Sequence, residues 1–480
     1  MADQRVKTES PPVTASGPEL HYQAPAAAAR QLSLQGMHGT VAVPPTTAGF
    51  WRNYWAFVGP ALLVSVGYMD PGNWGTDLQG GAQYKYGLLW VVGLASLMAI
   101  FMQVISARLG VVTGKDLAQF CRDHFPAWAR WPNWIAAEIA IGACDLAEVL
   151  GSAVALNLLL HIPLLWAVIL TAADVLLLLA LQGMGMRFIE AIIFVLISTI
   201  GICYFIEIFI LPQTRPSFGE MGHAFLRPGF REAGMVYVAI GIIGATVMPH
   251  NLYLHSALVQ SRRFQSDDHS IRQAVRFNTV DSVVALTIAF FINAAILVLA
   301  AMLFYGKHSV SVGTQTYVFN DNTDWIRVAY LTLAPLIGIA AASPLFAIAL
   351  LASGQSSTIT GTLAGQVVME GFMHWQILPW VRRIITRVLA ILPAVLIIGL
   401  RGDSSVNDLL VLSQVVLALQ LPLAMFPLLY FTSRRRYMGK YRNGWFLMAF
   451  GWGSCLLITA MDIWGLPGSI KTAWQVITGG

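Results

Sequence analysis

The sequence is poor in charged residues. Asp, Glu, Lys and Arg make up only 11% of its 480 residues, whereas hydrophobic residues make up 56% and the mean hydropathy is +0.65. Soluble domains carry about 25% charged residues, so this chain has too few to cover a surface in contact with water. The shortage excludes an ordinary soluble protein and indicates one embedded in a lipid bilayer. The formal net charge is +5, but the basic residues lie between the apolar segments, which argues against a nucleic-acid-binding patch.

Motifs of several functional classes are also missing. No His-Glu-x-x-His occurs, which excludes a typical intramembrane zinc protease, and no Gly-x-x-x-x-Gly-Lys-Ser/Thr occurs, which excludes the usual nucleotide module of a pump. The four cysteines have no metal-ligand spacing and are expected to pack between helices. We therefore predict neither an enzyme nor a resident cofactor.

What the chain does contain is a series of apolar segments after a polar start. Residues 1–49 are rich in Pro, Ala, Ser and Thr and contain no apolar run, so they predict a disordered tail and show no cleavable signal peptide. Eleven later segments are long enough to cross about 30 Å of hydrocarbon, which predicts an all-α polytopic membrane protein. They lie near 54–79, 88–110, 133–160, 163–182, 188–212, 234–258, 279–305, 326–352, 383–400, 406–431 and 444–464.

The basic residues predict the orientation of these segments. Of the 29 Lys and Arg residues, 21 lie in the tail and in the loops after even-numbered segments. Because basic loops stay on the cytoplasmic side, we expect the N-terminus in the cytoplasm and the C-terminus outside.

Two segments are interrupted by a proline at matching depth. The first contains Pro71 within Val-Gly-Tyr-Met-Asp-Pro-Gly-Asn-Trp (66–74), and the sixth contains Pro249 within Gly-Ala-Thr-Val-Met-Pro-His-Asn (244–251). Paired interruptions in two halves of a chain are typical of secondary transporters, which bind their substrate at the breaks. We predict a LeuT-like 5+5 inverted repeat with discontinuous helices 1 and 6. Its parts are a first repeat at 50–212, a second at 234–431, and an eleventh transmembrane helix at 444–464.

The residues around the breaks are suited to a metal ion. A helix proline leaves the carbonyl four residues earlier without its N–H partner, here the carbonyl of Gly67 or Ala245. Asp70, Asn73 and Met248 lie close to these carbonyls. Oxygen ligands suit many cations, whereas a thioether adds affinity only for softer transition metals. The set predicts a site for Mn²⁺, Fe²⁺, Co²⁺ or Cd²⁺ rather than Mg²⁺ or Ca²⁺. The alternatives are a space-filling methionine and prolines that only kink their helices.

A second group of ionisable residues predicts a proton route. Asp145 and Glu148 are three residues apart on segment three, hence on one face of a helix. Buried acids need partners, and segment nine supplies arginines; the alternative is a purely structural salt-bridge cluster. Asp70 belongs to both groups, because burial favours its protonated form and a bound dication its charged form. The arginines are Arg382, Arg383 and Arg387.

A few other polar residues are weaker candidates. His250, directly after the second break, can relay protons because histidine titrates near neutral pH, or can serve packing and hydrogen bonding alone. His255, Asn293 and Gly67 are candidates for the vestibule or its gating, with helix–helix hydrogen bonding as the alternative for Asn293. Asp174 and Glu207 are intramembrane acids for which the sequence supplies no partner.

Taken together, the motifs resemble those of the Nramp family (natural resistance-associated macrophage proteins). Asp-Pro-Gly-Asn at 70–73 and Met-Pro-His at 248–250 match its paired signatures. Gly-Gln-Ser-Ser-Thr-Ile-Thr-Gly-Thr at 354–362 also matches, and we expect it in the cytoplasmic loop after segment eight. The resemblance covers roughly residues 50–465. Further matches are Ser-Ala-Arg-Leu-Gly-Val-Val-Thr-Gly at 106–114, Asp-Leu-Ala-Glu at 145–148 and Leu-Ser-Gln-Val-Val-Leu at 412–417.

The resemblance implies a proton-coupled symporter that imports Mn²⁺ and Fe²⁺ into the cytoplasm by alternating access. It implies that Asp70, Asn73, the Ala245 carbonyl and Met248 are metal ligands and that Gln414 approaches the ion in an occluded state. It also links the region of segments three and nine to proton passage. The implied partners are the metal ion, the proton and the lipid bilayer, without nucleic acid or an obligatory protein, and the absence of targeting signals fits a cell inner (plasma) membrane.

Two other classes of transporter are alternatives to a symporter for Mn²⁺ and Fe²⁺. A LeuT-fold amino-acid transporter uses the same breaks, but an anionic Asp70 would repel the carboxylate of its substrate. A transporter for a different cation remains the open alternative.

Overall fold

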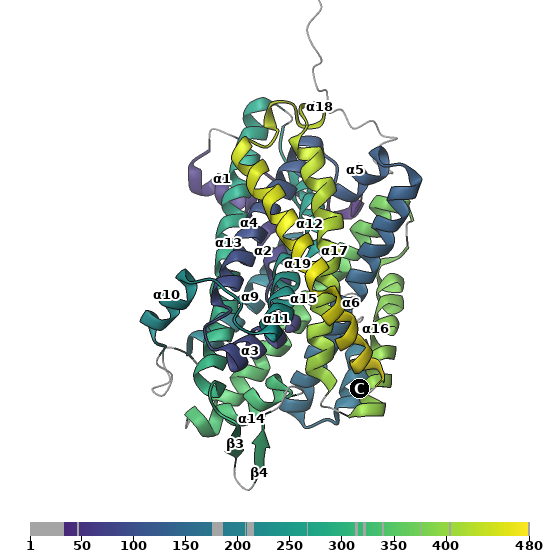
Figure 1. The fold of residues 1–480 in the computed structure, drawn as a ribbon. Helices are drawn as coiled ribbons and strands as arrows, with labels where there is room; N and C mark the ends of the chain where they lie inside the picture. Colours follow the sequence, from purple (N-terminus) through teal and green to yellow (C-terminus); the bar gives the residue numbers. More distant parts are fainter. Residues whose placement is uncertain are drawn as a thin grey trace, which may run out of the picture.

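The computed structural model describes residues 33–478 apart from 46–47, 175–185, 207, 209–215, 266, 313–314, 320–322, 338–339, 376 and 403–404. Most described residues are helical, and the long helices form a bundle with small elements at its two ends (Figure 1). In chain order the helices are η2 (Gln35–Met37), α1 (Phe50–Phe57), α2 (Pro60–Gly67), α3 (Pro71–Tyr84), α4 (Leu89–Thr113), α5 (Leu117–His124), α6 (Ala127–Leu160), α7 (Leu164–Leu170), η3 (Thr171–Ala173), α9 (Met186–Phe205), α10 (Phe218–Leu226), α11 (Ala233–Val247), α12 (Pro249–Leu258), η5 (Val259–Ser261), α13 (Asp268–Phe304), α14 (Trp325–Ile337), α15 (Ala342–Met373), α16 (Pro379–Arg401), α17 (Val406–Ser433), α18 (Arg435–Met438), η7 (Gly439–Tyr441) and α19 (Trp445–Thr478).

Two short strand pairs complete the fold. β1 (Val41–Ala42) pairs in parallel with β2 (Arg262–Arg263), and β3 (Ser309–Val312) pairs antiparallel with β4 (Gln315–Val318). In Figure 1, α1, α5 and α18 lie at the upper end of the bundle, whereas the β3–β4 hairpin, α14 and the C-terminus lie at the lower end.

Most of the predicted spans coincide with single long helices. Within the described part of the chain, eight helices are long and apolar enough to cross a membrane, and they correspond to segments two, three, five, six, seven, nine, ten and eleven. Segment one is divided between α2 and α3, neither of which is long enough alone. Segment four begins with α7 and η3, and its remainder from residue 175 lies outside the described residues.

The predicted position of segment eight is wrong. The predicted span 326–352 covers α14 and only the start of α15, and the run 354–362, expected in a loop, lies buried inside α15. Hydroxyl-bearing residues lower the apparent hydropathy of this helix, yet their groups are satisfied along its own backbone: Ser356 donates to the Ala352 carbonyl and Thr362 to the Thr358 carbonyl. A polar helix of this kind is shielded by its neighbours rather than by lipid.

Part of the predicted disordered tail is ordered. Residues 33–45 form η2 and β1, and the backbone N–H of Leu34 donates to the Glu370 carboxylate at 2.9 Å. Leu34 and Val41 are buried, so this stretch gains apolar contacts that composition alone did not reveal. The prediction for residues 1–32 lies outside the described residues.

The peripheral helices present apolar surface to their surroundings. Leu389, Leu396 and Leu400 on α16 are exposed, as are Ile463 and Trp464 on α19. A surface of this kind is unfavourable in water and ordinary in a hydrocarbon phase. The outer helices therefore agree with the bilayer interpretation drawn from composition.

Ionic contacts hold the start of α2. The carboxylate of Asp281 accepts from the backbone N–H groups of Gly59 (3.2 Å) and Ala61 (3.0 Å). Gly59 has φ 137°, which few residues other than glycine adopt. Arg262 pairs with Glu190 at 2.7 Å in the same buried group. These contacts fix the inner half of the first broken segment against α9 and α13.

Candidate functional site

The first break turns the end of α2 into the start of α3. Asp70 is the residue before α3, and its Oδ1 accepts the backbone N–H of Asn73 at 2.9 Å. Pro71 follows at the first helical position, where its missing N–H is harmless. The Gly67 carbonyl was predicted to be free, but it accepts the backbone N–H of Asp70 at 3.3 Å because the last turn of α2 tightens.

The second break is made by a methionine in a strained conformation. Met248 joins α11 to α12 with φ 37° and ψ 101°. A non-glycine residue there costs about 1–3 kcal/mol, and such strain collects at functional sites. The Sδ of Met248 accepts from Asn251 Nδ2 at 3.4 Å, and it would lie 3.0 Å from a Cβ at Gly67. Glycine at 67 therefore leaves room for the thioether.

The amide of Asn73 connects the two breaks. Its Nδ2 donates to Asp70 Oδ1 at 2.7 Å and to the Ala245 carbonyl at 3.1 Å. Ala245 is the residue whose carbonyl Pro249 leaves without a helical partner. Two acceptors from opposite halves of the chain thus converge on one small group.

Two more predicted residues lie against this group. Asn293 on α13 donates to the Tyr68 carbonyl at 2.7 Å and to Asn73 Oδ1 at 3.4 Å. Gln414 on α17 packs against Gly72, where a Cβ would collide with its amide. The structure therefore brings Asp70, Asn73, Ala245, Met248, Asn293 and Gln414 together around the breaks.

A chain of side-chain hydrogen bonds closes one side of the breaks. His255 Nδ1 lies 3.0 Å from Gln103 Oε1, and Gln103 Nε2 lies 2.7 Å from the Tyr68 hydroxyl. The Tyr68 hydroxyl in turn donates to the Val247 carbonyl at 3.4 Å. His255, predicted for the vestibule or its gating, therefore lies in a hydrogen-bonded row beside the breaks, and all these side chains are buried.

The site is closed to solvent and incompletely satisfied. Asp70, Asn73, Ala245, Met248 and Gln414 each have 0% relative exposure. Asp70 Oδ2 and Gln414 Oε1 find no hydrogen-bond partner within the described residues. Buried oxygens in that condition are costly unless a cation, a proton or water completes them.

One buried acid near the site escaped the sequence analysis. Asp77 on α3 has 0% exposure, and neither of its carboxylate oxygens has a hydrogen-bond partner in the described part of the chain. It lies one helical turn beyond Asn73, on the same face of α3. Asn73 contacts Asn293, and a Cβ at Gly81 would meet the Leu297 carbonyl, so Asp77 lies between two contacts with α13. The seven-residue spacing from Asp70 was the available signal.

The predicted ionic group between segments three and nine exists as a buried network of α6 and α16. Arg383 pairs with Asp145 and, at 3.1 Å, with Glu148. Arg382 pairs with Glu138 at 2.7 Å nearer the surface. The network is therefore continuous along one face of α6.

Asp174 and two hydroxyls complete the network. Asp174, which had no predicted partner, pairs with Arg387 and lies 3.7 Å from Arg383. Ser357 and Thr358 on α15 donate to Glu148 at 3.0 and 3.1 Å. The misplacement of segment eight hid these hydroxyls, because a loop would not have faced α6.

The buried core of the network has more acids than bases. Asp145, Glu148 and Asp174 face Arg383 and Arg387, and all five are buried. If every group were ionised, one negative charge would remain without a partner. An uncompensated charge inside a membrane costs several kcal/mol, so the neutral arrangement has one proton on a carboxyl group.

A row of serines on α15 links this network to the first break. Ser353 donates to the Met69 carbonyl, directly before Asp70, and Ser357 one turn along the helix donates to Glu148. His250, in the first turn of α12, is also buried, and its Nδ1 has no partner among the described residues. Glu207 lies outside the described residues.

Comparisons with known proteins agree with this architecture. Residues 61–467 match the family described as natural resistance-associated macrophage protein-like. A protein of Nostoc sp. named divalent metal cation transporter MntH is 49% identical over 440 residues, covering 91% of this chain and 96% of the relative. A protein of the same name from Listeria welshimeri is 45% identical, with 92% and 95% covered.

Solved structures agree as well. The manganese transporter of Eremococcus coleocola, solved with an aromatic bis-isothiourea compound, has a TM-score of 0.81 and 36% identity, covering 92% of this chain and 91% of that one. Mhp1, a nucleobase-cation-symport-1 family transporter, has a TM-score of 0.52 at 14% identity and so shares the fold alone. The predicted LeuT-like helical architecture is confirmed by these similarities.

Proposed function

Because this chain belongs to the Nramp family of membrane transporters, we propose that it imports divalent transition metals, chiefly Mn²⁺ and Fe²⁺, together with protons. Relatives that cover nearly the whole chain are named divalent metal cation transporters, and a similar solved structure is named a manganese transporter. These names support metal transport as the activity and argue against an enzyme. The ligands, the cargo preference and the proton coupling are our inferences from the site.

The observation that carries the proposal is the position of the Asn73 amide. Its Nδ2 occupies the point where Asp70 Oδ1 and the Ala245 carbonyl converge. A half-turn of the amide exchanges its nitrogen and oxygen, and three oxygens then face one point. The positive amide hydrogens stand where a cation would bind in the loaded state. Asp70, Asn73 and Ala245 supply the oxygen ligands of the proposed site.

The remaining ligands are Met248 and Gln414. Met248 supplies the only soft donor of the set, which favours Mn²⁺, Fe²⁺ and similar ions over Ca²⁺ and Mg²⁺. Gln414 Oε1 lacks a partner beside Gly72, so it is free to join the ion in the closed state. Asn293 Nδ2 donates to Asn73 Oδ1 and so holds the amide in its orientation without the ion; the half-turn on ion binding breaks this hydrogen bond.

The proton route begins at Asp70 and continues into the network of α6 and α16. A dication at the site displaces the proton from Asp70 by charge repulsion. The row from Met69 through Ser353 and Ser357 to Glu148 leads from the break to carboxyl groups that together hold one proton. Arg382, Arg383 and Arg387 keep the remaining acids ionised. His250 extends the same route beside the break.

Asp77 marks the outer approach to the site. A buried carboxyl group without a partner is neutral while no ion is present, and it exchanges its proton for a cation that enters along α3 and α13. One carboxylate supplies a single ligand, which suits brief contact rather than tight binding. The proposed path therefore runs from Asp77 to the site at the breaks.

We place the protein in a cell inner (plasma) membrane with the N-terminus in the cytoplasm and the C-terminus outside. In this orientation the gate-like row of His255, Gln103 and Tyr68 faces the cytoplasm. α3 and Asp77 face the outside. Release of the ion to the cytoplasm then requires movement of α2 and of this row.

Calorimetric titration of the purified protein with Mn²⁺ tests the site. Replacing the charged ligand in Asp70→Asn is expected to weaken binding roughly 10- to 150-fold, taking the about 1.5–3 kcal/mol that a hydrogen bond to a charged group contributes as the measure of the lost contact. Asp462→Asn on α19 is the matched control, since Asp462 is also a buried membrane acid with an unpartnered oxygen in the described structure. Equal Mn²⁺ affinity in both variants would show that the ion binds elsewhere.

A further inference from the structure

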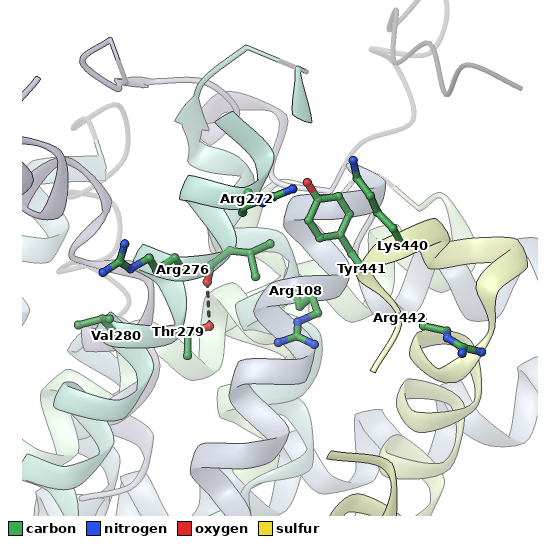
Figure 2. A pocket seen from close by; sticks show the side chains of 9 residues that line it. Arg108, Arg272, Arg276, Thr279, Val280, Lys440, Tyr441 and Arg442 are labelled. Carbon is green, nitrogen blue, oxygen red and sulfur yellow. Dashed lines mark hydrogen bonds between the residues drawn. The ribbon is translucent and has the colours of Figure 1, made fainter. Parts of the chain in front are cut away.

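A pocket lined by basic side chains lies between α4, α13 and the segment after α18, at the end of the bundle proposed to be cytoplasmic (Figure 2). Its volume is about 430 Å³, within the range of roughly 300–1,000 Å³ typical of small-molecule sites. Figure 2 shows Arg108 on α4 below Arg272 and Tyr441, with Arg276 and Arg442 to either side. We call this cavity the basic pocket; its cationic residues are Arg108, Arg272, Arg276, Lys440 and Arg442.

The basic pocket has a large excess of positive charge. Asp268 pairs with both Lys440 and, at 3.3 Å, Arg272. The other three cations, Arg108, Arg276 and Arg442, form no ion pair with any described residue. One acid therefore compensates five bases, and an anion is the missing component.

Arg108 is the least expected member of this group. It lies within the membrane-spanning helix α4, is partly buried, and its Nε has no hydrogen-bond partner in the described structure. A topology signal requires only basic residues in cytoplasmic loops. It does not require a guanidinium inside a helix facing four other cations, so the positive-inside rule leaves Arg108 unexplained.

The surface below the pocket is suited to acyl chains. Val280 lines the pocket and lies one turn from Arg276 on α13. Val284, Ile288 and Phe291 continue along the same face and are exposed, at 44%, 44% and 65%. A charged group at the membrane surface followed by an apolar stripe reproduces the order of headgroup and chains in a phospholipid.

We propose that the basic pocket binds the headgroup phosphate of an anionic phospholipid of the cytoplasmic leaflet, with its acyl chains along α13. Guanidinium groups match phosphate oxygens through paired hydrogen bonds. Basic pockets between transmembrane helices on the cytoplasmic side suit lipid headgroups. The bound lipid joins α4, α13 and the segment before α19, none of which supplies a metal ligand, so this site is separate from the proposed transport site.

Native mass spectrometry of the detergent-purified protein with equimolar phosphatidylglycerol and phosphatidylcholine tests this proposal. We expect preferential retention of phosphatidylglycerol and a roughly tenfold weaker apparent affinity in Arg276→Gln, as expected for one lost charge-assisted contact. Arg108→Gln is expected to behave similarly, and the more exposed Arg276 keeps the test valid if Arg108→Gln fails to fold. Arg435→Gln is the control, because Arg435 lies on the same end of the bundle without lining the pocket.

Three results would overturn the proposal. One is equal retention of the two lipids by the unaltered protein. Another is an equal loss of affinity in Arg276→Gln and Arg435→Gln, which would indicate a general charge effect. The third is complete displacement of phosphatidylglycerol by millimolar inorganic phosphate, which would identify a site for a free anion.

Discussion

Met248 shows most clearly how a single residue specialises this site. Met248 holds a backbone conformation that glycine would adopt with less strain. Keeping a methionine side chain at this position therefore costs about 1–3 kcal/mol of backbone strain. The thioether points toward Gly67, next to the residues that join the breaks. We therefore propose that this position determines selectivity among cations rather than affinity for cations in general.

Met248→Ala should lower discrimination between metals more than it lowers transport. Loss of the soft ligand is expected to reduce Mn²⁺ affinity roughly tenfold, or about 1.4 kcal/mol, while leaving the hard-ion affinity provided by the oxygens. Uptake of Mn²⁺ in the presence of rising Ca²⁺ measures this, and Ca²⁺ should inhibit the variant at lower concentration. An equal loss for all ions would refute the role of the thioether.

Asp77→Asn should affect capture of the ion rather than its turnover. Removing the outer charge is expected to raise the KM for Mn²⁺ roughly three- to tenfold, with uptake at saturating Mn²⁺ nearly unchanged, because only an early contact is lost. Initial uptake rates over a range of Mn²⁺ concentrations provide both values. Asp462→Asn serves again as the control, and a variant with an unaltered KM would remove Asp77 from the path.

Single residues were the part of the site that the sequence predicted best. Asp70, Asn73, Ala245 and Met248 flank prolines in otherwise apolar runs, so spacing predicted each pair, and the matched breaks of an inverted repeat predicted that the two pairs meet. The state of the Gly67 carbonyl could not be predicted, because it depends on how tightly the last turn of α2 closes. Asp77 was recognisable from its spacing, but only burial revealed that it lacks a partner.

At the scale of elements, three helices together build the ionic network that we propose as the proton route. α6 and α16 supply the ionic groups, and α15 supplies the hydroxyls that hold Glu148. The buried core has three acids and two bases, so one proton belongs to the assembly rather than to a single residue. This excess supports the proposed proton route over the alternative of a structural salt-bridge cluster, which balanced charges would favour.

Glu148→Gln should uncouple protons from metal. The amide oxygen of the variant still accepts from Thr358 and Arg383, the amide nitrogen faces the Ser357 hydroxyl, and the ionisable carboxyl group is lost. We expect Mn²⁺ binding to stay within roughly twofold, because the network does not touch the ion, and the proton flux per Mn²⁺ to fall strongly. Parallel Mn²⁺ and pH measurements on proteoliposomes test this, with Glu138→Gln at the partly exposed edge as control. Unchanged proton flux would make the network structural.

Elements were predicted well where their sequence is apolar throughout and poorly where a buried helix carries many hydroxyl groups. The eight long apolar helices follow from hydropathy. α15 does not, because its serines and threonines are satisfied by their own backbone and by Glu148. Asp174 pairs with Arg387, and the two residues lie in segments that belong to different repeats. Such a pairing depends on how the helices pack, which no local sequence pattern encodes.

At the scale of the whole molecule, the proposed metal site lies inside the bundle and the basic pocket lies at one end. The proposed ligands are fully buried midway along the bundle, where both broken segments meet. The basic pocket lies beside α18, at the end of the bundle opposite the β3–β4 hairpin (Figure 1). In the proposed orientation this end faces the cytoplasm.

We propose that metal and protons move together through this molecule. Mn²⁺ uptake into proteoliposomes that contain a pH reporter, with and without an inward proton gradient, tests this coupling. We expect faster uptake with the gradient and acidification of the lumen that depends on Mn²⁺, both lost in Asp70→Asn. Mn²⁺ uptake that is indifferent to the gradient and moves no protons would refute the proposed symport.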